Sequence, residues 1–159
     1  MKKLLFLVLL CAITTSLRAQ VNSIGFQNTS SCDVWIVLYG STGACATTHS
    51  SNPIQVPAGA TFGYSDPTAV PGGMNGGGTT LGATDVFTRV QVLEGNPAYA
   101  GIVACLTPGG PSITGSGCLG PTSTSLLVYD VIPFTCNLCG NVTVQWTAAS
   151  PTAAVIEIF

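Results

Sequence analysis

The chain has very few charged side chains, and lysine is absent from nearly all of it. Only four Lys and Arg and six Asp and Glu occur among 159 residues. Lys2, Lys3 and Arg18 lie at the start, so Arg89 is the only permanent cation after residue 18. Nucleic-acid binding needs clustered Lys and Arg to neutralise phosphates, so this class of protein is excluded. A phosphate loop ending in Gly-Lys-Ser/Thr is excluded too, because no lysine remains to complete it.

Side chains suited to catalysis are also scarce. The only histidine, His49, lies in the polar segment 46–51, which predicts a solvated loop imidazole. No Gly-x-Ser-x-Gly nucleophile elbow is present, and the carboxylates are scattered along the chain. Asp66 and Asp85 flank a glycine-rich segment, but two carboxylates are fewer than a calcium site normally recruits. The sequence therefore predicts a protein that is not an enzyme and that needs no metal or cofactor. A small secreted hydrolase ranks third among the functional hypotheses, after the two described at the end of this section.

The first 19 residues have the pattern of a signal peptide. Lys2 and Lys3 supply a positive start, Leu4–Ile13 is an apolar core, and cleavage is expected after Ala19. The apolar core is too short to span a bilayer, and no later apolar run approaches that length. Residues 20–159, 140 residues after subtracting 19 from 159, are expected to form one exported domain that does not span a membrane. Its location would be secreted, at the cell surface or in the periplasm.

Six cysteines follow this segment, and an even number in an exported chain indicates a disulfide framework. Six cysteines allow fifteen pairings, and spacing alone does not determine which one forms. Separations of 13, 13 and 3 residues make sequential pairing the first expectation. The expected pairs are Cys32 with Cys45, Cys105 with Cys118, and Cys136 with Cys139.

The pattern of apolar residues predicts an all-β domain. No segment after residue 19 has helical periodicity over ten residues, whereas short β-rich runs alternate with Gly, Pro, Ser and Asn. Such a succession is typical of a β-sandwich of immunoglobulin-like or jelly-roll type, with about eight or nine antiparallel strands. The predicted strands are Val21–Asn28, Asp33–Tyr39, Ile54–Val56, Thr61–Tyr64, Val86–Glu94, Ala100–Leu106, Leu126–Ile132, Asn141–Ala148 and Ala153–Phe159.

Three segments allow finer expectations. Asn141–Ala148 alternates polar and apolar residues, which predicts a strand with one wet face. Val34–Tyr39 is apolar throughout, which predicts a central strand covered on both faces. Residues 66–85 are rich in Gly and Pro and predict a long loop with little to bury, serving either as a mobile connector or in function.

The opening of the exported part resembles small secreted bacterial β-domains of unknown role. The resemblance rests on Phe26-Gln27-Asn28, Cys32-Asp33-Val34-Trp35 and Val56-Pro57-Ala58-Gly59. The same residues are similar to the opening of thaumatin-like proteins, whose dense cysteine set and acidic cleft have no counterpart here. The resemblance covers the N-terminal third only, implies a β-sandwich and transfers no functional residue.

The leading functional hypothesis is an exported structural or interaction protein of a cell surface, matrix or appendage. Thirty Ser and Thr follow residue 19, so solubility depends on hydroxyl groups, and copies repel one another only weakly. The last predicted strand ends at the final residue and could add to a neighbour's sheet through Val155, Ile156, Ile158 and Phe159. The expected partners are other copies of the chain or other surface proteins.

The alternative hypothesis is a carbohydrate-binding, lectin-like module. In such a module an exposed aromatic ring stacks on a sugar, while Asp or Asn side chains bind its hydroxyl groups. Five residues in or near predicted loops have suitable side chains. They are Tyr64, Asp66, Asn75, Asp85 and Tyr99.

Overall fold

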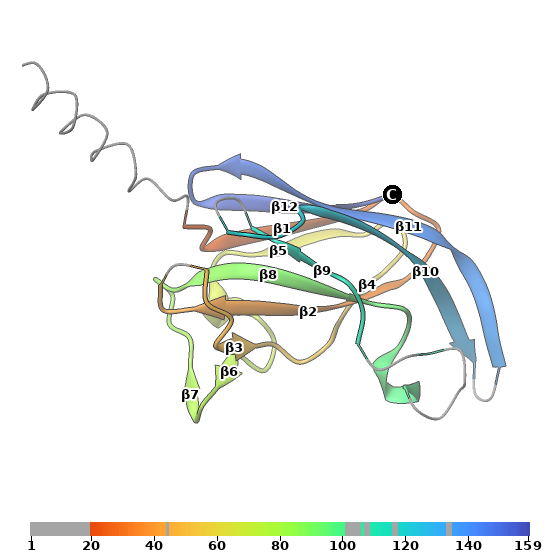
Figure 1. Cartoon of the computed structure of the whole chain (residues 1–159), viewed down its shortest axis with the longest axis horizontal. Helices are drawn as coiled ribbons and strands as arrows, with labels where there is room; N and C mark the ends of the chain where they lie inside the picture. Colours follow the sequence, from red (N-terminus) through yellow and green to blue (C-terminus); the bar gives the residue numbers. More distant parts are fainter. Residues whose placement is uncertain (1–19, 44, 101–105, 107–108, 116–117, 133–134) are drawn as a thin grey trace, which may run out of the picture.

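A computed structural model shows two β-sheets packed against each other (Figure 1). The structure describes residues 20–159 except 44, 101–105, 107–108, 116–117 and 133–134. The predicted all-β sandwich is therefore confirmed. Within the described residues, no helix has the length and apolar character needed to cross a membrane.

The first sheet has five strands in the order β10-β11-β12-β1-β5. Strand β12 pairs in parallel with β1 on one side and antiparallel with β11 on the other. The other neighbouring strands are antiparallel. The strands are β1 (Ser23–Asn28), β5 (Thr61–Tyr64), β10 (Ser123–Ile132), β11 (Thr135–Ser150) and β12 (Ala153–Ile158).

The prediction that the C-terminal strand offers a free edge is wrong. Val155 pairs with both Gly25 and Thr147, so both edges of β12 are occupied. Ile156 and Ile158 are fully buried in the core, and only Phe159, at the end, is exposed. Phe159 also exchanges two backbone hydrogen bonds with Thr143. The sequence could not reveal this, because the parallel partner β1 comes from the opposite end of the chain.

The second sheet has seven strands, six of them in the order β7-β6-β3-β2-β8-β9, with β4 also pairing with β2. Four of its strands are only two or three residues long and were not predicted: β3, β6, β7 and β9. Most of the predicted strand Ala100–Leu106 lies outside the described residues. The strands are β2 (Val34–Ser41), β3 (His49–Ser50), β4 (Ile54–Val56), β6 (Asn75–Gly76), β7 (Thr79–Thr80), β8 (Val86–Leu93) and β9 (Ser112–Thr114).

The core lies between the two sheets and is formed by alternate residues of the strands. In β11, Val142, Val144 and Trp146 are buried while Asn141 and Gln145 are exposed, which confirms the predicted wet face, although Ala148 is exposed. In β2 the alternation was not predicted. Its inward side chains are fully buried, but its outward side chains are only half-buried, so this central strand is not covered on both faces. The inward residues are Val34, Ile36 and Leu38, and the outward ones are Trp35, Val37 and Tyr39.

The glycine-rich segment 66–85 is more ordered than a bare loop. It contains the 3-10 turn η1 (Pro67–Ala69) and the small hairpin β6–β7, in which Leu81 donates a backbone hydrogen bond to Met74. Met74 and Leu81 are buried in the core. The expectation that this segment has little to bury is therefore wrong, because these two apolar side chains anchor it.

The disulfides join distant parts of the chain. Cys32 is bonded to Cys139 and Cys45 to Cys118, with sequence separations of 107 and 73 residues. Cys136 is also disulfide-bonded, and Cys105 lies outside the described residues. All three sequential pairings are thus wrong, because Cys32, Cys118 and Cys139 each have a different partner. The fold brings the residues just before β2 into contact with β11, and the spacing of the cysteines in the sequence cannot predict that contact. Disulfides persist in oxidising environments, so the disulfide-bonded structure suits an oxidising compartment.

Candidate functional site

The five residues predicted to bind saccharide have local structural roles. Tyr64 packs edge-on against Phe26 and Phe62, with ring centroids 6.0 and 5.9 Å away. Its side chain is half-buried, and this burial raises the pKa of its hydroxyl above the usual value. Tyr64 therefore belongs to an aromatic cluster between β1 and β5 and does not form an open stacking platform.

The predicted polar residues stabilise turns. Asp66 caps η1, accepting a hydrogen bond of 2.8 Å from the Thr68 amide, and the hydrogen bonds from the Thr68 and Ser65 side chains lower the pKa of its carboxyl group. Asp85 accepts a hydrogen bond of 2.7 Å from the Gly82 amide. Asn75 donates to the Gly72 carbonyl and accepts from the Thr80 hydroxyl.

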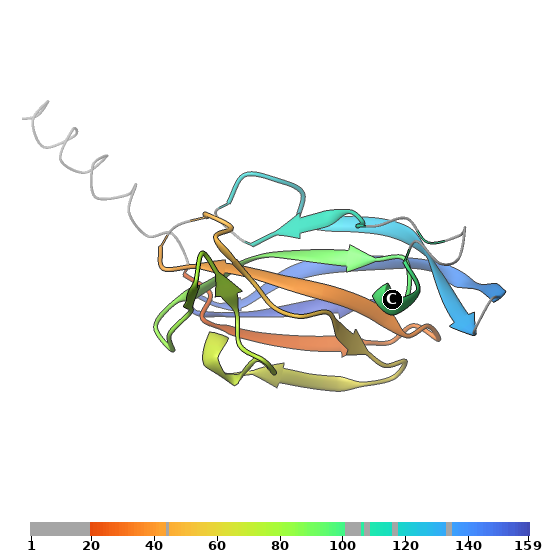
Figure 2. The same cartoon turned by 90° about the horizontal axis from the view of Figure 1, so that it is seen from below.

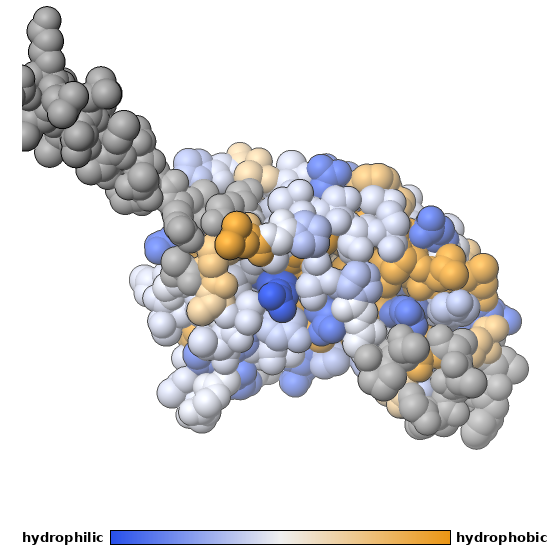
Figure 3. Space-filling view, in the orientation of Figure 1, coloured by the Kyte–Doolittle hydropathy of each residue, from blue (hydrophilic) through white to orange (hydrophobic). Residues whose placement is uncertain are grey.

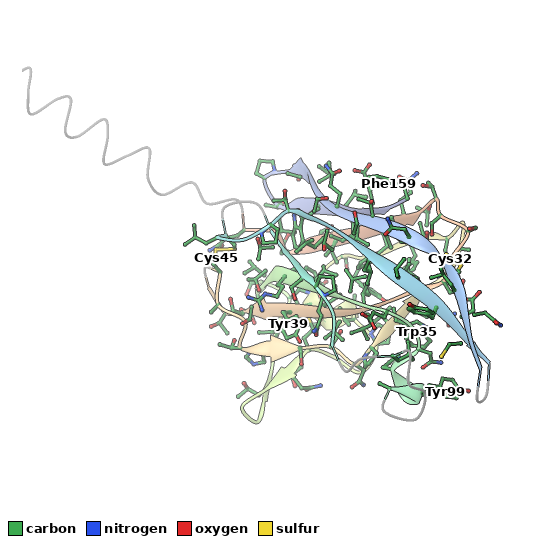
Figure 4. All side chains as sticks on the ribbon, turned by 45° about the vertical axis from the view of Figure 1, so that its right-hand side comes forward. Cys32, Trp35, Tyr39, Cys45, Tyr99 and Phe159 are labelled. Carbon is green, nitrogen blue, oxygen red and sulfur yellow. A yellow bond between two sulfur atoms is a disulfide. The ribbon has the colours of Figure 1, made fainter. Side chains whose placement is uncertain are left out.

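Tyr99 is separate from these four residues. It ends the 3-10 turn η2 (Pro97–Tyr99), which follows β8, and Figure 4 shows it at the Trp35 end of the molecule. None of the five predicted residues lines either of the two hollows described below.

His49 is not a solvated loop residue, so that prediction is wrong. It belongs to β3 and is only 8% exposed. Its Nδ1 lies 2.8 Å from the Thr48 hydroxyl, and its Nε2 lies 2.9 Å from the Thr79 hydroxyl of β7. The imidazole therefore ties β3 to the β6–β7 hairpin through its contact with Thr79.

Seen from below, the second sheet lies in front of the first and turns its outer face toward the viewer (Figure 2). Its neighbouring strands β2 and β8 contribute aromatic and polar side chains to this face. We define the outer face by Trp35, Val37 and Tyr39 of β2 together with Arg89 and Gln91 of β8. Tyr39 lies opposite Arg89 and Val37 lies opposite Gln91, so all five side chains share one face. All five are half-buried. Figure 4 shows Trp35 and Tyr39 at opposite ends of this face, with Cys45 beyond Tyr39.

A hollow of about 170 Å³ lies at the Trp35 end of the outer face. The residues that line it come from both sheets and from the loops beside them, and they comprise two aromatic residues, two acidic residues and two residues with side-chain amides. We call it the Trp35 hollow. It is lined by Asp33, Trp35, Gln55, Asn96, Tyr129 and Asp130.

The polar groups of the Trp35 hollow are held by further hydrogen bonds. Asp33 accepts 2.6 Å and 2.9 Å hydrogen bonds from the Gln55 side chain and the Ala58 amide. Asn96 caps η2 by accepting from the Ala98 amide. The Tyr129 amide donates to the Glu94 carbonyl and so fixes β10 of the first sheet beside the end of β8. Three polar side chains of this hollow, those of Asp33, Gln55 and Asn96, are therefore held in place.

The chemistry of the Trp35 hollow suits a small neutral polyol. Aromatic rings provide rigid apolar surfaces for the C–H faces of a sugar, while carboxylate and amide oxygens accept hydrogen bonds from its hydroxyl groups. Asp33 and Asp130 are brought to one hollow although 97 positions separate them, from 33 to 130.

A second, larger hollow lies at the other end of the outer face. Its volume is about 380 Å³, and Arg89 lines part of its wall. We call it the Arg89 cleft. It is lined by Cys45, Thr47, Thr88, Arg89, Thr114, Cys118 and Leu119.

Sequence reasoning missed both hollows. Trp35 was assigned to a strand covered on both faces, and Tyr129 to the predicted strand Leu126–Ile132 with no role assigned. The signal that could have found them is the pair of aromatic residues at positions 35 and 39, which lie on the same face of one strand with Val37 between them. The partners in β4, η2 and β10 come from distant segments, so their convergence required the fold.

Among the residues that the structure describes, no group of three or more His, Cys, Asp or Glu could hold a metal ion. Comparison with known proteins adds no relative. No protein-family model, no curated protein sequence and no solved structure matches this chain.

Proposed function

We propose that this chain is an exported, non-enzymatic binding protein that recognises saccharides through the Trp35 hollow. The observation that carries the proposal is the convergence of Trp35 and Tyr129 with four hydrogen-bonding side chains in one hollow. The aromatic rings would stack on sugar C–H groups, and Asp33 and Asp130 would accept hydrogen bonds from hydroxyl groups. This proposal keeps the carbohydrate-binding alternative but moves its site away from the loops.

The net charge of the chain supports a ligand that carries little negative charge. Residues 20–159 contain one Arg and six acids, a formal charge of 1 − 6 = −5, so strongly anionic ligands would be repelled. The disulfides support an exported location, since they would be reduced in most cytosolic environments. Export also agrees with the signal-peptide pattern of residues 1–19.

The experiment is a glycan-array screen of the purified protein, followed by titration of each hit. Trp35→Ala should weaken binding by about 2 kcal/mol, or roughly thirtyfold, as expected for a central aromatic contact. The matched control is Tyr99→Ala, which removes a half-buried aromatic ring outside the hollow and should leave affinity unchanged. Equal binding by wild type and Trp35→Ala would contradict the proposal. Release of reducing sugar from a bound glycan would instead favour the hydrolase alternative, with Asp33 and Asp130 as its carboxylates.

A second candidate function is assembly with other copies or with surface proteins through β10. This strand of ten residues is the edge of the first sheet, and β12 pairs only with the Val144–Ser150 part of β11. The rest of the β10–β11 hairpin therefore extends past β12 as a two-stranded ribbon (Figure 1). Leu127 and Leu138 on this ribbon are 47% and 58% exposed, and Figure 3 shows apolar surface gathered over the same region.

Exposed apolar residues on and beside an edge strand favour strand pairing between molecules. Sedimentation velocity of the wild type and of a Leu127→Lys, Leu138→Lys variant would test this candidate. An assembly that the double variant disperses supports it, because charge on an edge opposes pairing. A wild-type monomer at all concentrations would contradict it.

A further inference from the structure

Arg89 is the only permanent cation after residue 18, and it is not neutralised by an ion pair within the described residues. Its guanidinium carbon lies 6.0 Å from the centre of the Tyr39 ring, a cation–π contact. Its Nε atom is buried and has no hydrogen-bond partner among the described residues. A buried donor without an acceptor is unfavourable, so this orientation of Arg89 needs an explanation.

The Arg89 side chain is half-buried and lines the Arg89 cleft, although its Nε atom is itself buried. Cys45 follows β2 and Cys118 follows β9, the two strands that flank β8, so the disulfide between them joins loops on both sides of Arg89. This bond braces the walls of a hollow of about 380 Å³. The cleft is therefore a built feature of the fold with a cationic wall.

Threonine hydroxyls complete the polar lining. The Thr88 hydroxyl donates to the Ala46 carbonyl, and the Thr114 hydroxyl donates to the Pro121 carbonyl. Thr47 is exposed, and no partner for its hydroxyl occurs among the described residues, so its proton is available to a ligand. One guanidinium with one available hydroxyl matches the two oxygens of a carboxylate.

We infer that the Arg89 cleft binds the carboxylate of an acidic saccharide, of the uronic-acid class, whose neighbouring rings occupy the outer face. This inference rests on the proposed saccharide-binding function and adds the ligand class. A single cation in a domain of formal charge −5 favours a ligand with isolated carboxylates over phosphorylated polyanions. Trp35 and Tyr39 are four residues apart on one strand, about 13 Å, so a short oligosaccharide can reach both hollows.

The two sites differ in the part of the ligand that they recognise. The Trp35 hollow, with two carboxylates in its wall, disfavours an anionic group and accepts a neutral ring face. The Arg89 cleft prefers the carboxylate. A ligand with both features would therefore bind in one direction along the outer face.

The test is nuclear magnetic resonance of protein labelled with ¹⁵N-arginine. Only Arg18 and Arg89 occur in the sequence, so the Nε–Hε spectrum holds at most two signals, and Arg89→Gln identifies one of them. The probes are a trisaccharide of two neutral hexoses and one terminal galacturonic acid, and the methyl ester of the same trisaccharide, which has no charge, at equal ionic strength. We expect the acid, but not the ester, to shift the Arg89 signal, and Arg89→Lys to weaken binding of the acid roughly tenfold because lysine lacks the planar fork.

Each outcome decides one of the two proposals. The inference is overturned, and the proposed function is kept, if three results occur together. The acid and the ester bind with equal affinity, the Arg89 signal does not move, and Trp35→Ala abolishes binding of both probes. If the acid shifts the Arg89 signal but Trp35→Ala leaves the affinity for both probes unchanged, the carboxylate site is kept and the proposed role of the Trp35 hollow is overturned. Absence of binding by both probes overturns the inference, whatever neutral glycans bind on the array. Because the wild-type spectrum alone reports the shift, misfolding of an Arg89 variant would not prevent a decision.

Discussion

Removal of the disulfide between Cys32 and Cys139 should cause a large loss of stability, with a magnitude set by the length of the loop that it closes. The bond joins residues 107 positions apart. Loop-closure entropy then contributes about 4.8 kcal/mol to the free energy of unfolding at 25 °C. A bond across 13 residues, the spacing of Cys32 and Cys45, would contribute only about 2.9 kcal/mol. The two connectivities therefore differ by about 2 kcal/mol, which unfolding experiments resolve.

The assay is equilibrium urea unfolding of wild type and of the Cys32→Ala, Cys139→Ala double variant, with disulfides mapped in both proteins. Domains of this size are stable by about 5–15 kcal/mol, so a loss near 4.8 kcal/mol should lower the midpoint strongly. The Cys45→Ala, Cys118→Ala variant is the matched comparison, because its loop of 73 residues predicts a loss of about 4.4 kcal/mol. A loss below about 3 kcal/mol, or a map showing Cys32 bonded to Cys45, would refute this reasoning.

Two smaller perturbations test local parts of the fold. Gly76→Ala should destabilise the protein by roughly 1–3 kcal/mol, because a Cβ there would lie 2.0 Å from the Thr48 carbonyl oxygen. Thermal unfolding would measure this loss of stability. An unchanged unfolding midpoint would show that β3 and β6 are not in contact. Asp66→Ala should destabilise the protein at neutral pH by removing the η1 cap. Since the folded pKa of Asp66 is lowered, the stability from its carboxylate is present above the unfolded pKa of about 3.9 and is lost as the pH falls through the folded pKa. The difference between wild type and Asp66→Ala should therefore shrink below about pH 4, and a difference that stays constant down to pH 2 would contradict the role of the ionised cap.

The predictions that succeeded depended on local pattern. Thr61–Tyr64 and Ile54–Val56 were placed at their observed bounds, and the alternation in Asn141–Ala148 correctly identified its buried valines and tryptophan. These features follow from two-residue periodicity and from turn residues, which the sequence displays directly.

The predictions that failed concerned contacts between distant segments. Strand β12 was expected to have a free edge, but β1, from the opposite end of the chain, pairs with it in parallel. Cys32 meets Cys139 for the same reason, because packing of the two sheets and not proximity in sequence decides which cysteines are neighbours. The hairpin of two-residue strands in the glycine-rich segment was missed because only Met74 and Leu81 anchor it.

The candidate site illustrates the same limit. Asp33 and Trp35 were both visible at the start of a predicted strand, yet their partners Tyr129 and Asp130 lie on the other sheet. A search for exposed aromatic residues in loops therefore selected Tyr64 and missed the outer face of a strand. Topology, and not composition, creates the Trp35 hollow.

The central claim is that saccharide binds at the Trp35 hollow, and the indole resonances of the protein test it most directly. The two tryptophans give two indole N–H signals, one from half-buried Trp35 and one from Trp146, which is 3% exposed in the core. Titration with a glycan that binds on the array should move the Trp35 signal and leave the Trp146 signal in place, with binding lost in Trp35→Ala. Saturating glycan that leaves the Trp35 signal unmoved would contradict the account.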